Sequence, residues 1–109
     1  METLNFKTLK KQFCPIVLPD EKGTKVLLTT PNKSLLEEFI DLTSSLSEAK
    51  TGKEVTQDLY KLTTKIFNLN INKLKFTRSQ IESMFDLEDV YMFMSHYATF
   101  ISEITNSKN

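Results

Sequence analysis

Cys14 and His96 are the two side chains whose chemistry could support nucleophilic catalysis, and each is the only residue of its type in the chain. A cysteine becomes a strong nucleophile when a nearby positive charge or a helix N-terminus lowers its pKa. Cys14 instead precedes Pro15 in a run of strand-forming residues, and His96 falls on the polar side of the last predicted helix. We therefore interpret His96 as a solvent-facing residue, and the sequence predicts no catalytic residues and no enzyme activity.

The sequence also gives little support for a metal-binding or a phosphate-binding site. One histidine and one cysteine cannot supply the ligand sets that hold zinc. Carboxylates gather at Asp86, Glu88 and Asp89; they could bind a divalent cation, but acidic residues also cap the N-terminus of a helix, and we favour capping. The two glycines, Gly23 and Gly52, are isolated, so they form no phosphate-binding loop. The sequence predicts no metal and no cofactor.

The charges of the chain balance, with 14 basic and 14 acidic residues, but they are unevenly distributed. Residues 1–33 contain six lysines against three acids, whereas residues 81–109 contain five acids and one lysine. Either the two ends neutralise each other within the fold, which we favour, or the acidic end is a partner surface. The densest basic groups lie among aromatic residues and comprise Lys7, Lys10, Lys11, Lys73, Lys75 and Arg78. A small nucleic-acid-binding phage or bacterial regulator is therefore the alternative function, although the zero net charge argues against it.

A chain of 109 residues, of which 39% are hydrophobic, has enough apolar material for one modest core, and we treat residues 1–109 as a single domain. One cysteine allows no internal disulfide and fits a reducing compartment. The first residues lack the apolar run of a signal peptide, and no stretch reaches the roughly 18 apolar residues of a membrane span. These features predict a cytoplasmic protein without a membrane partner.

Residues 1–30 are predicted to form a β-hairpin region. Two runs of apolar and β-branched residues, Phe13–Leu18 and Lys25–Thr30, flank the polar segment 19–24, whose Pro, Asp and Gly favour a turn. Pro15 is expected at the start or the edge of its strand, since proline donates no backbone hydrogen bond. The first ten residues either extend the sheet or dock loosely.

Residues 31–105 are predicted to be helical, and residues 106–109 to be a frayed tail. Asparagines at 68, 70 and 72 are expected to end the second helix. The chain is therefore expected to adopt an α+β fold that is mostly α-helical, with an N-terminal β-hairpin and about four helices. Helix starts are indicated at Ser34–Glu37 (with Thr30–Pro31 as a competing start), Thr51–Glu54, Thr77–Gln80 and Asp86–Asp89.

The last predicted helix, Asp86–Thr105, has a broad apolar face. Either it is the central helix of the domain, which we favour, or part of this face stays exposed for a protein partner, and both can hold. In the second case, replacing Phe100 with alanine should weaken partner binding and leave the fold intact. The central stripe contains Leu87, Val90, Met94, Tyr97, Ile101 and Ile104, with Phe93 and Phe100 on one side and Tyr91 and Ala98 on the other. The candidate partner-binding residues are Tyr91, Phe93, Met94, Tyr97, Phe100 and Ile104.

Three segments of the C-terminal third carry a recognisable pattern: FTRSQI at 76–81, LEDVYMF at 87–93 and YATFISEI at 97–104. An acidic Leu-Glu-Asp step leads into a helix with Phe, Tyr and Phe-Ile at regular intervals. This pattern resembles the C-terminal region of small tail assembly chaperones from phages and prophages of Gram-positive bacteria. The layout of a strand-forming N-terminal region before the helices is also similar to that family.

The resemblance implies a non-enzymatic protein of the infected host's cytoplasm that is not part of the mature virion. It implies binding to the tape measure protein, which keeps that long apolar helical protein soluble, and assistance to tail tube subunits that polymerise around it. The family has no catalytic motif to carry over. Many of its members also have a longer form made by ribosomal frameshifting. A small structural virion or adaptor subunit is a further alternative.

Overall fold

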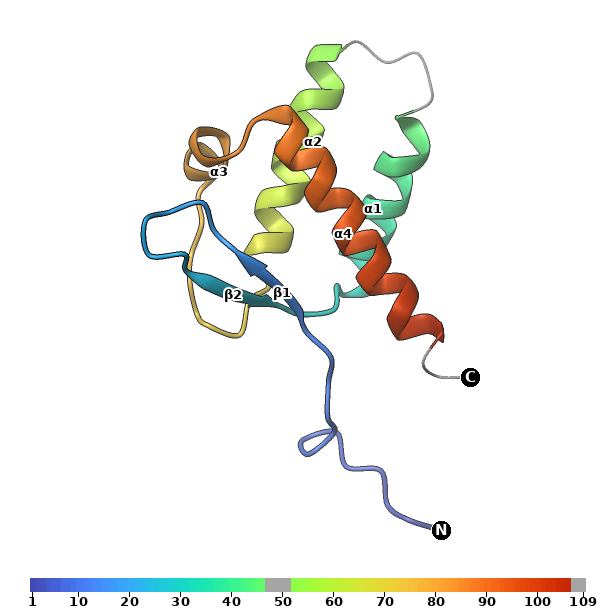
Figure 1. Ribbon diagram of the computed structural model, residues 1–109. Coiled ribbons are helices and arrows are strands. Elements are labelled where there is room, and N and C mark those ends of the chain that lie inside the picture. Colours follow the sequence, from blue (N-terminus) through green and yellow to red (C-terminus); the bar gives the residue numbers. More distant parts are fainter. Residues whose placement is uncertain (47–51, 107–109) are drawn as a thin grey trace.

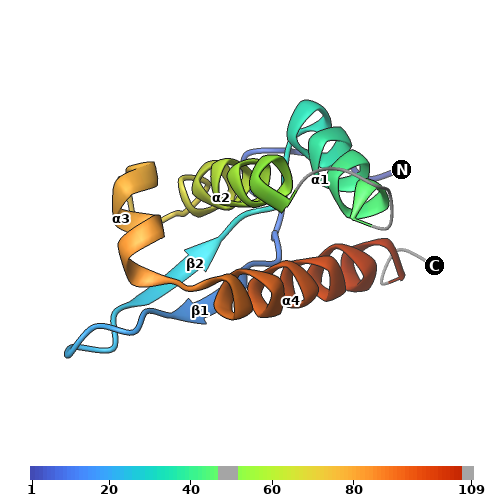
Figure 2. The same cartoon turned by 90° about the horizontal axis from the view of Figure 1, so that it is seen from above.

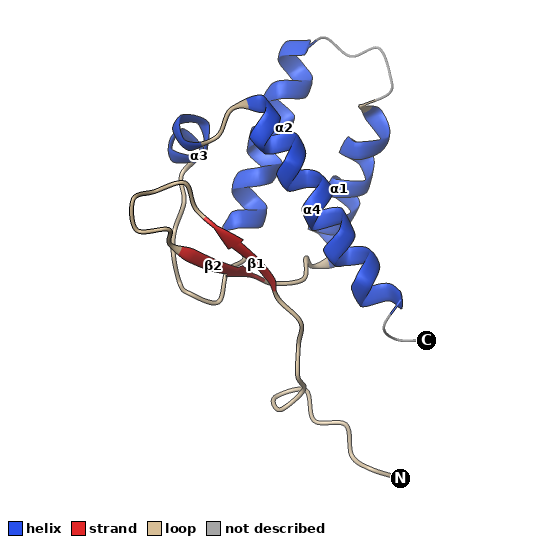
Figure 3. Ribbon diagram, viewed as in Figure 1, coloured by secondary structure: helices blue, strands red, loops and turns tan. Residues whose placement is uncertain are grey.

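The computed structural model describes residues 1–46 and 52–106 (Figure 1). Its architecture is the predicted α+β, mostly helical fold, with the hairpin at the N-terminal end and the helices after it (Figure 3). Asn106, the first residue of the predicted tail, is instead helical, and residues 107–109 lie outside the described residues. The elements are β1 (Cys14–Val17), β2 (Lys25–Leu28), α1 (Lys33–Ser45), α2 (Gly52–Phe67), α3 (Arg78–Met84) and α4 (Leu87–Asn106).

The hairpin forms where the two apolar runs predicted it. β1 and β2 pair antiparallel, with Cys14 opposite Leu28 and Pro15 opposite Leu27. Because side chains alternate along a strand, Cys14 and Leu28 face the core. β2 is the only strand that pairs with β1 among the described residues, so Pro15 lies on an edge strand, as predicted.

The turn between the strands is held by the carboxylate of Asp20. This group accepts hydrogen bonds from the Thr24 hydroxyl and from the Thr24 backbone N–H, the latter at 2.8 Å. The bond from the hydroxyl, followed by that from the backbone, holds the pKa of Asp20 below its usual value. Gly23 has a φ of 60°, the left-handed conformation that glycine adopts without strain.

A segment after α2 covers the second edge of β2. The Thr29 N–H donates to the Leu69 carbonyl at 2.7 Å, and the Ile71 N–H donates to the Leu27 carbonyl at 3.1 Å. The Leu27 N–H in turn donates to Asn72 Oδ1 at 2.9 Å. Residues 69–72 therefore join the hairpin to the helical part of the chain.

Asparagine side chains organise the loop that follows, as predicted for the end of α2. Asn68 Nδ2 donates to the Phe76 carbonyl at 2.9 Å, and Asn68 Oδ1 accepts from the Phe76 N–H at 2.8 Å. Asn70 makes the same pair of bonds with Leu74. The residue with positive φ in this loop is Lys73, at 60°, and not an asparagine.

The helix starts were predicted with mixed success. α1 begins after Asn32, whose Oδ1 accepts from the Leu35 N–H at 2.9 Å, so both Ser34 and Thr30–Pro31 were wrong. Asparagine caps a helix as well as serine does, and in this structure Asn32 is the residue that caps α1. The start of α3 is confirmed, because Thr77 and Gln80 form both bonds of a capping box. The predicted start at Thr51 lies outside the described residues, and α2 is described from Gly52.

The core lies between α4 on one side and α1 and α2 on the other, with the hairpin at one end (Figures 1 and 2). Each element contributes its apolar face, and α3 adds Ile81. None of the helices within residues 1–46 and 52–106 is long and apolar enough to cross a bilayer. The buried helix residues include Leu35, Phe39 and Leu42 of α1, Leu59, Leu62, Ile66 and Phe67 of α2, and Val90, Met94, Tyr97 and Phe100 of α4.

Residues 1–13, which we call the N-terminal arm, extend away from this body (Figure 1). All thirteen residues are exposed. The arm has one local turn, in which the Lys7 N–H donates to Asn5 Oδ1 at 3.0 Å. The first ten residues thus neither extend the sheet nor dock on the domain.

Candidate partner-binding surface

The carboxylates at the start of α4 cap the helix. Asp86 Oδ1 accepts from the Asp89 N–H at 2.8 Å, and the Asp86 N–H donates to Asp89 Oδ2 at 3.0 Å. This reciprocal pair confirms the capping interpretation of these residues. Within the described part of the chain, no group of three or more His, Cys, Asp and Glu side chains could hold a metal ion.

The inner face of α4 is the packed centre of the domain. Tyr97 is fully buried, its hydroxyl donates to the Thr29 carbonyl at 2.9 Å, and its ring meets Phe39 edge-on at 5.7 Å. Burial, with a smaller contribution from the charge of Cys14, raises the pKa of Tyr97 well above its usual value. The favoured interpretation of α4 as the central helix of the domain therefore holds for its inner face.

Aromatic side chains around Phe67 fix the N-terminal half of α4 to α2 and to the residues that flank α3. Phe67 lies at the centre of this cluster, with the ring of Phe93 at 4.9 Å, that of Phe85 at 5.4 Å and that of Phe76 at 5.5 Å. All three contacts are edge-to-face, the geometry that aromatic pairs prefer. Phe93 is half-buried, so it belongs mainly to this cluster and only in part to the surface.

Three of the six candidate partner-binding residues are core side chains. Met94 is 4% exposed, Tyr97 0% and Phe100 6%. The expectation that Phe100 can be truncated without loss of stability does not fit this burial. Phe93 and Ile104 are half-buried, and Tyr91 is exposed. The helix is rotated so that the flank with Phe93 and Phe100 packs inward, because those bulky rings fill the space beside Phe67 and Tyr97.

The opposite flank of α4 is exposed, and we call it the outer face. It includes Met92 at 69% exposure, Tyr91 at 42% and Leu87 at 41%. The pattern assigned Leu87 to the buried stripe, which is wrong, and placed Met92 on the solvent side, which is confirmed. Neither was a candidate partner residue. The outer face comprises Leu87, Glu88, Tyr91, Met92, Ser95, Ala98, Thr99, Ser102 and Glu103.

The two residues considered for catalysis lie in contrasting environments. Cys14 is 1% exposed, and burial, with a smaller effect of the Glu103 charge, raises the pKa of its thiol to about 11. A protonated buried thiol is a poor nucleophile at neutral pH. His96 is exposed on α4, as predicted. This arrangement lacks the activated thiolate that a cysteine nucleophile needs.

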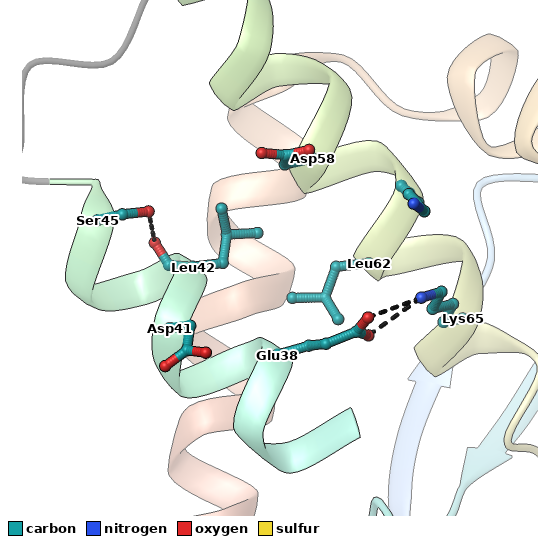
Figure 4. A pocket seen from close by; sticks show the side chains of 8 residues that line it. Glu38, Asp41, Leu42, Ser45, Asp58, Leu62 and Lys65 are labelled. Atoms are coloured by element: carbon teal, nitrogen blue, oxygen red, sulfur yellow. Dashed lines mark hydrogen bonds and ion pairs between the residues drawn. The ribbon is translucent and has the colours of Figure 1, made fainter. Parts of the chain in front are cut away.

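A groove of about 230 Å³ lies between α1 and α2 (Figure 4). Leu42 and Leu62 form its apolar floor, and Glu38 reaches across it to Lys65, with Nζ 2.8 Å from Oε1. The ion pair is exposed on both sides, so it contributes at most about 1 kcal/mol. Charges of both signs line the rim, which suits polar ligands better than an apolar helix.

The basic groups of the alternative function are all exposed but lie on different segments. Lys7, Lys10 and Lys11 are on the N-terminal arm, and Lys73 and Lys75 are on the loop after α2. Arg78, the sixth member, pairs with Glu82 at 3.2 Å.

The outer face of α4 combines exposed apolar side chains with carboxylates on a helix whose inner face is fixed in the core. Residues 87–106 contain no lysine or arginine. This surface can bind an apolar segment of another protein, particularly one with basic residues. Comparison of the chain with protein-family models, with curated proteins and with solved structures finds no match in any of the three.

Proposed function

We propose that this protein is a non-catalytic chaperone of phage tail assembly, which binds the tape measure protein and assists tail tube polymerisation. The observation that supports this proposal is the exposure of three apolar side chains on α4, namely Leu87, Tyr91 and Met92. The resemblance of residues 76–104 to the tail assembly chaperones supplies the identity of the client. The protein acts in the host cytoplasm and leaves the tail before the virion is complete.

The outer face suits a client that is a long amphipathic helix. Such a helix presents apolar side chains at intervals of three and four residues, and these can pack against Leu87 and Tyr91, which are four residues apart on α4. α4 is anchored by its buried half, so binding orders no further backbone on the chaperone side and the entropic cost is small. The carboxylates of Glu88 and Glu103 keep the outer face soluble when no client is present.

Affinity for tape measure segments tests the proposal. We would measure binding of purified helical segments by calorimetry, using wild type and the double variant Tyr91→Ala, Met92→Ala. Loss of two central contact side chains should weaken binding about tenfold or more. Ile40→Ala is the matched control, because Ile40 is an apolar side chain that is 51% exposed on α1. The proposal is wrong if no segment binds wild type, or if the control weakens binding as much as the double variant.

The nucleic-acid alternative makes a different prediction. Its support is the exposure of the lysines on the N-terminal arm and on the loop after α2. Phosphate contacts release counterions, so retention on heparin or DNA would fall steeply with salt. A client held through moderate salt favours the chaperone, whereas salt-sensitive retention that needs Lys73 and Lys75 favours the regulator.

A further inference from the structure

The N-terminal arm exposes large apolar side chains that the rest of the chain leaves uncovered. Phe6 is 73% exposed, Leu4 64%, Leu9 44% and Phe13 38%. Four such side chains within thirteen residues form a larger apolar surface than scattered exposed residues usually do. A second molecule that covers them would remove this surface from water.

The charges of the arm complement those of the outer face. The arm carries Lys7, Lys10 and Lys11 against the single acid Glu2, while α4 carries acids and no lysine or arginine. Glu88 and Glu103 are both exposed on the outer face. Arm and face thus match in both respects, since each has exposed apolar side chains and their charges are opposite.

The lengths of the two elements also match. The arm ends where β1 begins at Cys14, whose thiol is close enough to Glu103 to feel its charge. Thirteen extended residues span up to about 45 Å, and a helix of 20 residues is about 30 Å long. The arm can therefore run along the whole of α4. In Figure 1 the arm extends away from the body of its own molecule, so we take the α4 of a neighbouring molecule as its acceptor.

We propose that two copies of this chain exchange their N-terminal arms, each arm lying on the outer face of the other copy's α4. Phe6 and Leu9 would cover Tyr91 and Met92, and the arm's lysines would lie beside the glutamates of the outer face. The exchange is reciprocal, so it closes as a twofold dimer. A fully exposed phenylalanine can bury roughly 150–250 Å², and Phe6 and Phe13 expose 73% and 38% of theirs, so together they offer about one phenylalanine's area per arm. With Leu4 and Leu9, and with the surfaces that both arms cover, the buried area stays below the roughly 1,600 Å² of a standard interface, which fits a weak dimer.

Arm exchange has a regulatory consequence that rests on the proposed function. The arm and the client would compete for the same outer face, so a client must displace the arm. Ordering the arm costs conformational entropy, which keeps the dimer weak enough for this displacement. The dimer itself does not depend on any client.

A charge-reversal experiment tests the exchange directly. The arm variant carries Lys7→Glu, Lys10→Glu and Lys11→Glu, and the face variant carries Glu88→Lys and Glu103→Lys. Sedimentation velocity at low salt, without client, should find wild type dimeric and each variant alone monomeric, with at least a tenfold rise in the dissociation constant. An equimolar mixture of the two variants should dimerise again, because each arm then meets a face of opposite charge.

Two further variants separate arm exchange from dimerisation through another surface. Glu37→Lys with Asp41→Lys is the matched control, since it reverses two exposed carboxylates on α1 and should leave the dimer intact. Deletion of residues 1–12 should give a monomer that melts like wild type at high dilution. The proposal is overturned if wild type is monomeric at all concentrations, if the mixture stays monomeric, if the deletion still dimerises, or if the α1 control abolishes the dimer. Binding of tape measure segments is measured separately, so either proposal can fail without the other.

Discussion

Replacing Phe100 with alanine tests which face of α4 packs in the core, because Phe100 is buried on a helix that also carries exposed apolar residues. Phe100 is 6% exposed, and its ring centre lies 5.7 Å from that of Tyr97. Truncation removes the ring and leaves a cavity beside Tyr97, whose own hydroxyl is tied to Thr29. We expect a large loss of stability.

The magnitude follows from the burial. Phe→Ala replacements in protein cores cost about 3–5 kcal/mol, the sum of lost transfer free energy and of the cavity. Phe100 lies in the C-terminal half of α4, where neighbouring side chains can relax into the space, so we expect about 3 kcal/mol. For a domain of this size, that corresponds to a fall in Tm of roughly 12–24 °C. It is also a large share of the 5–15 kcal/mol by which domains are typically stable.

Thermal and urea unfolding followed by circular dichroism measure this loss. Met92→Ala is the matched control, because Met92 is on the same helix and is 69% exposed. Its effect on the free energy of unfolding should stay within about 0.5 kcal/mol. If Phe100→Ala melts within a few degrees of wild type, or if Met92→Ala destabilises the domain as strongly, the assignment of inner and outer faces is wrong.

Three further changes have defined outcomes. Asp86→Ala removes the acceptor for the Asp89 N–H and should lower the free energy of unfolding by about 1 kcal/mol in urea; an unchanged midpoint would contradict the cap. Thr63→Val should raise the urea midpoint, by about 1 kcal/mol in free energy, because the buried Thr63 Oγ1 has no hydrogen-bond partner among the described residues; a lower midpoint would argue against this. The free energy of unfolding should be constant up to about pH 8.5 and fall as pH rises further. The folded state raises the pKa values of Cys14 and Tyr97, so the unfolded chain releases those protons first. Equal free energies of unfolding at about pH 8 and pH 10.5 would contradict the burial of both groups.

Features set by a few neighbouring residues could be predicted from the sequence. The hairpin follows from two apolar runs around a turn, and the starts of α3 and α4 follow from side chains that bond backbone groups three residues away. The start of α1 was missed because Asn32 stands between two other plausible caps, and all three satisfy the same local rule. The preference of these residue types for the N-cap does not decide which of the three caps the helix.

The rotation of α4 could not be predicted, because a helical period gives the width of an apolar arc and not the part that packs. Phe93 and Phe100 turn inward because Phe67 and Tyr97 offer aromatic contacts, and Leu87 is left outside although it lies on the predicted stripe. Half of the candidate partner residues therefore proved to be core. Met92 was overlooked as a contact residue because its neighbours on the helix are polar.

The attachment of residues 69–72 to β2 carries no local signal, since Leu27 and Asn72 are 45 residues apart. This attachment covers the outer edge of β2. The outer edge of β1 is interrupted by Pro15, which lies opposite Leu27 and has no N–H to donate. The hairpin thus offers little template for a neighbouring chain to extend into a fibril. The covered edge and Pro15 therefore lower the tendency of this protein to nucleate aggregation, even at high concentration.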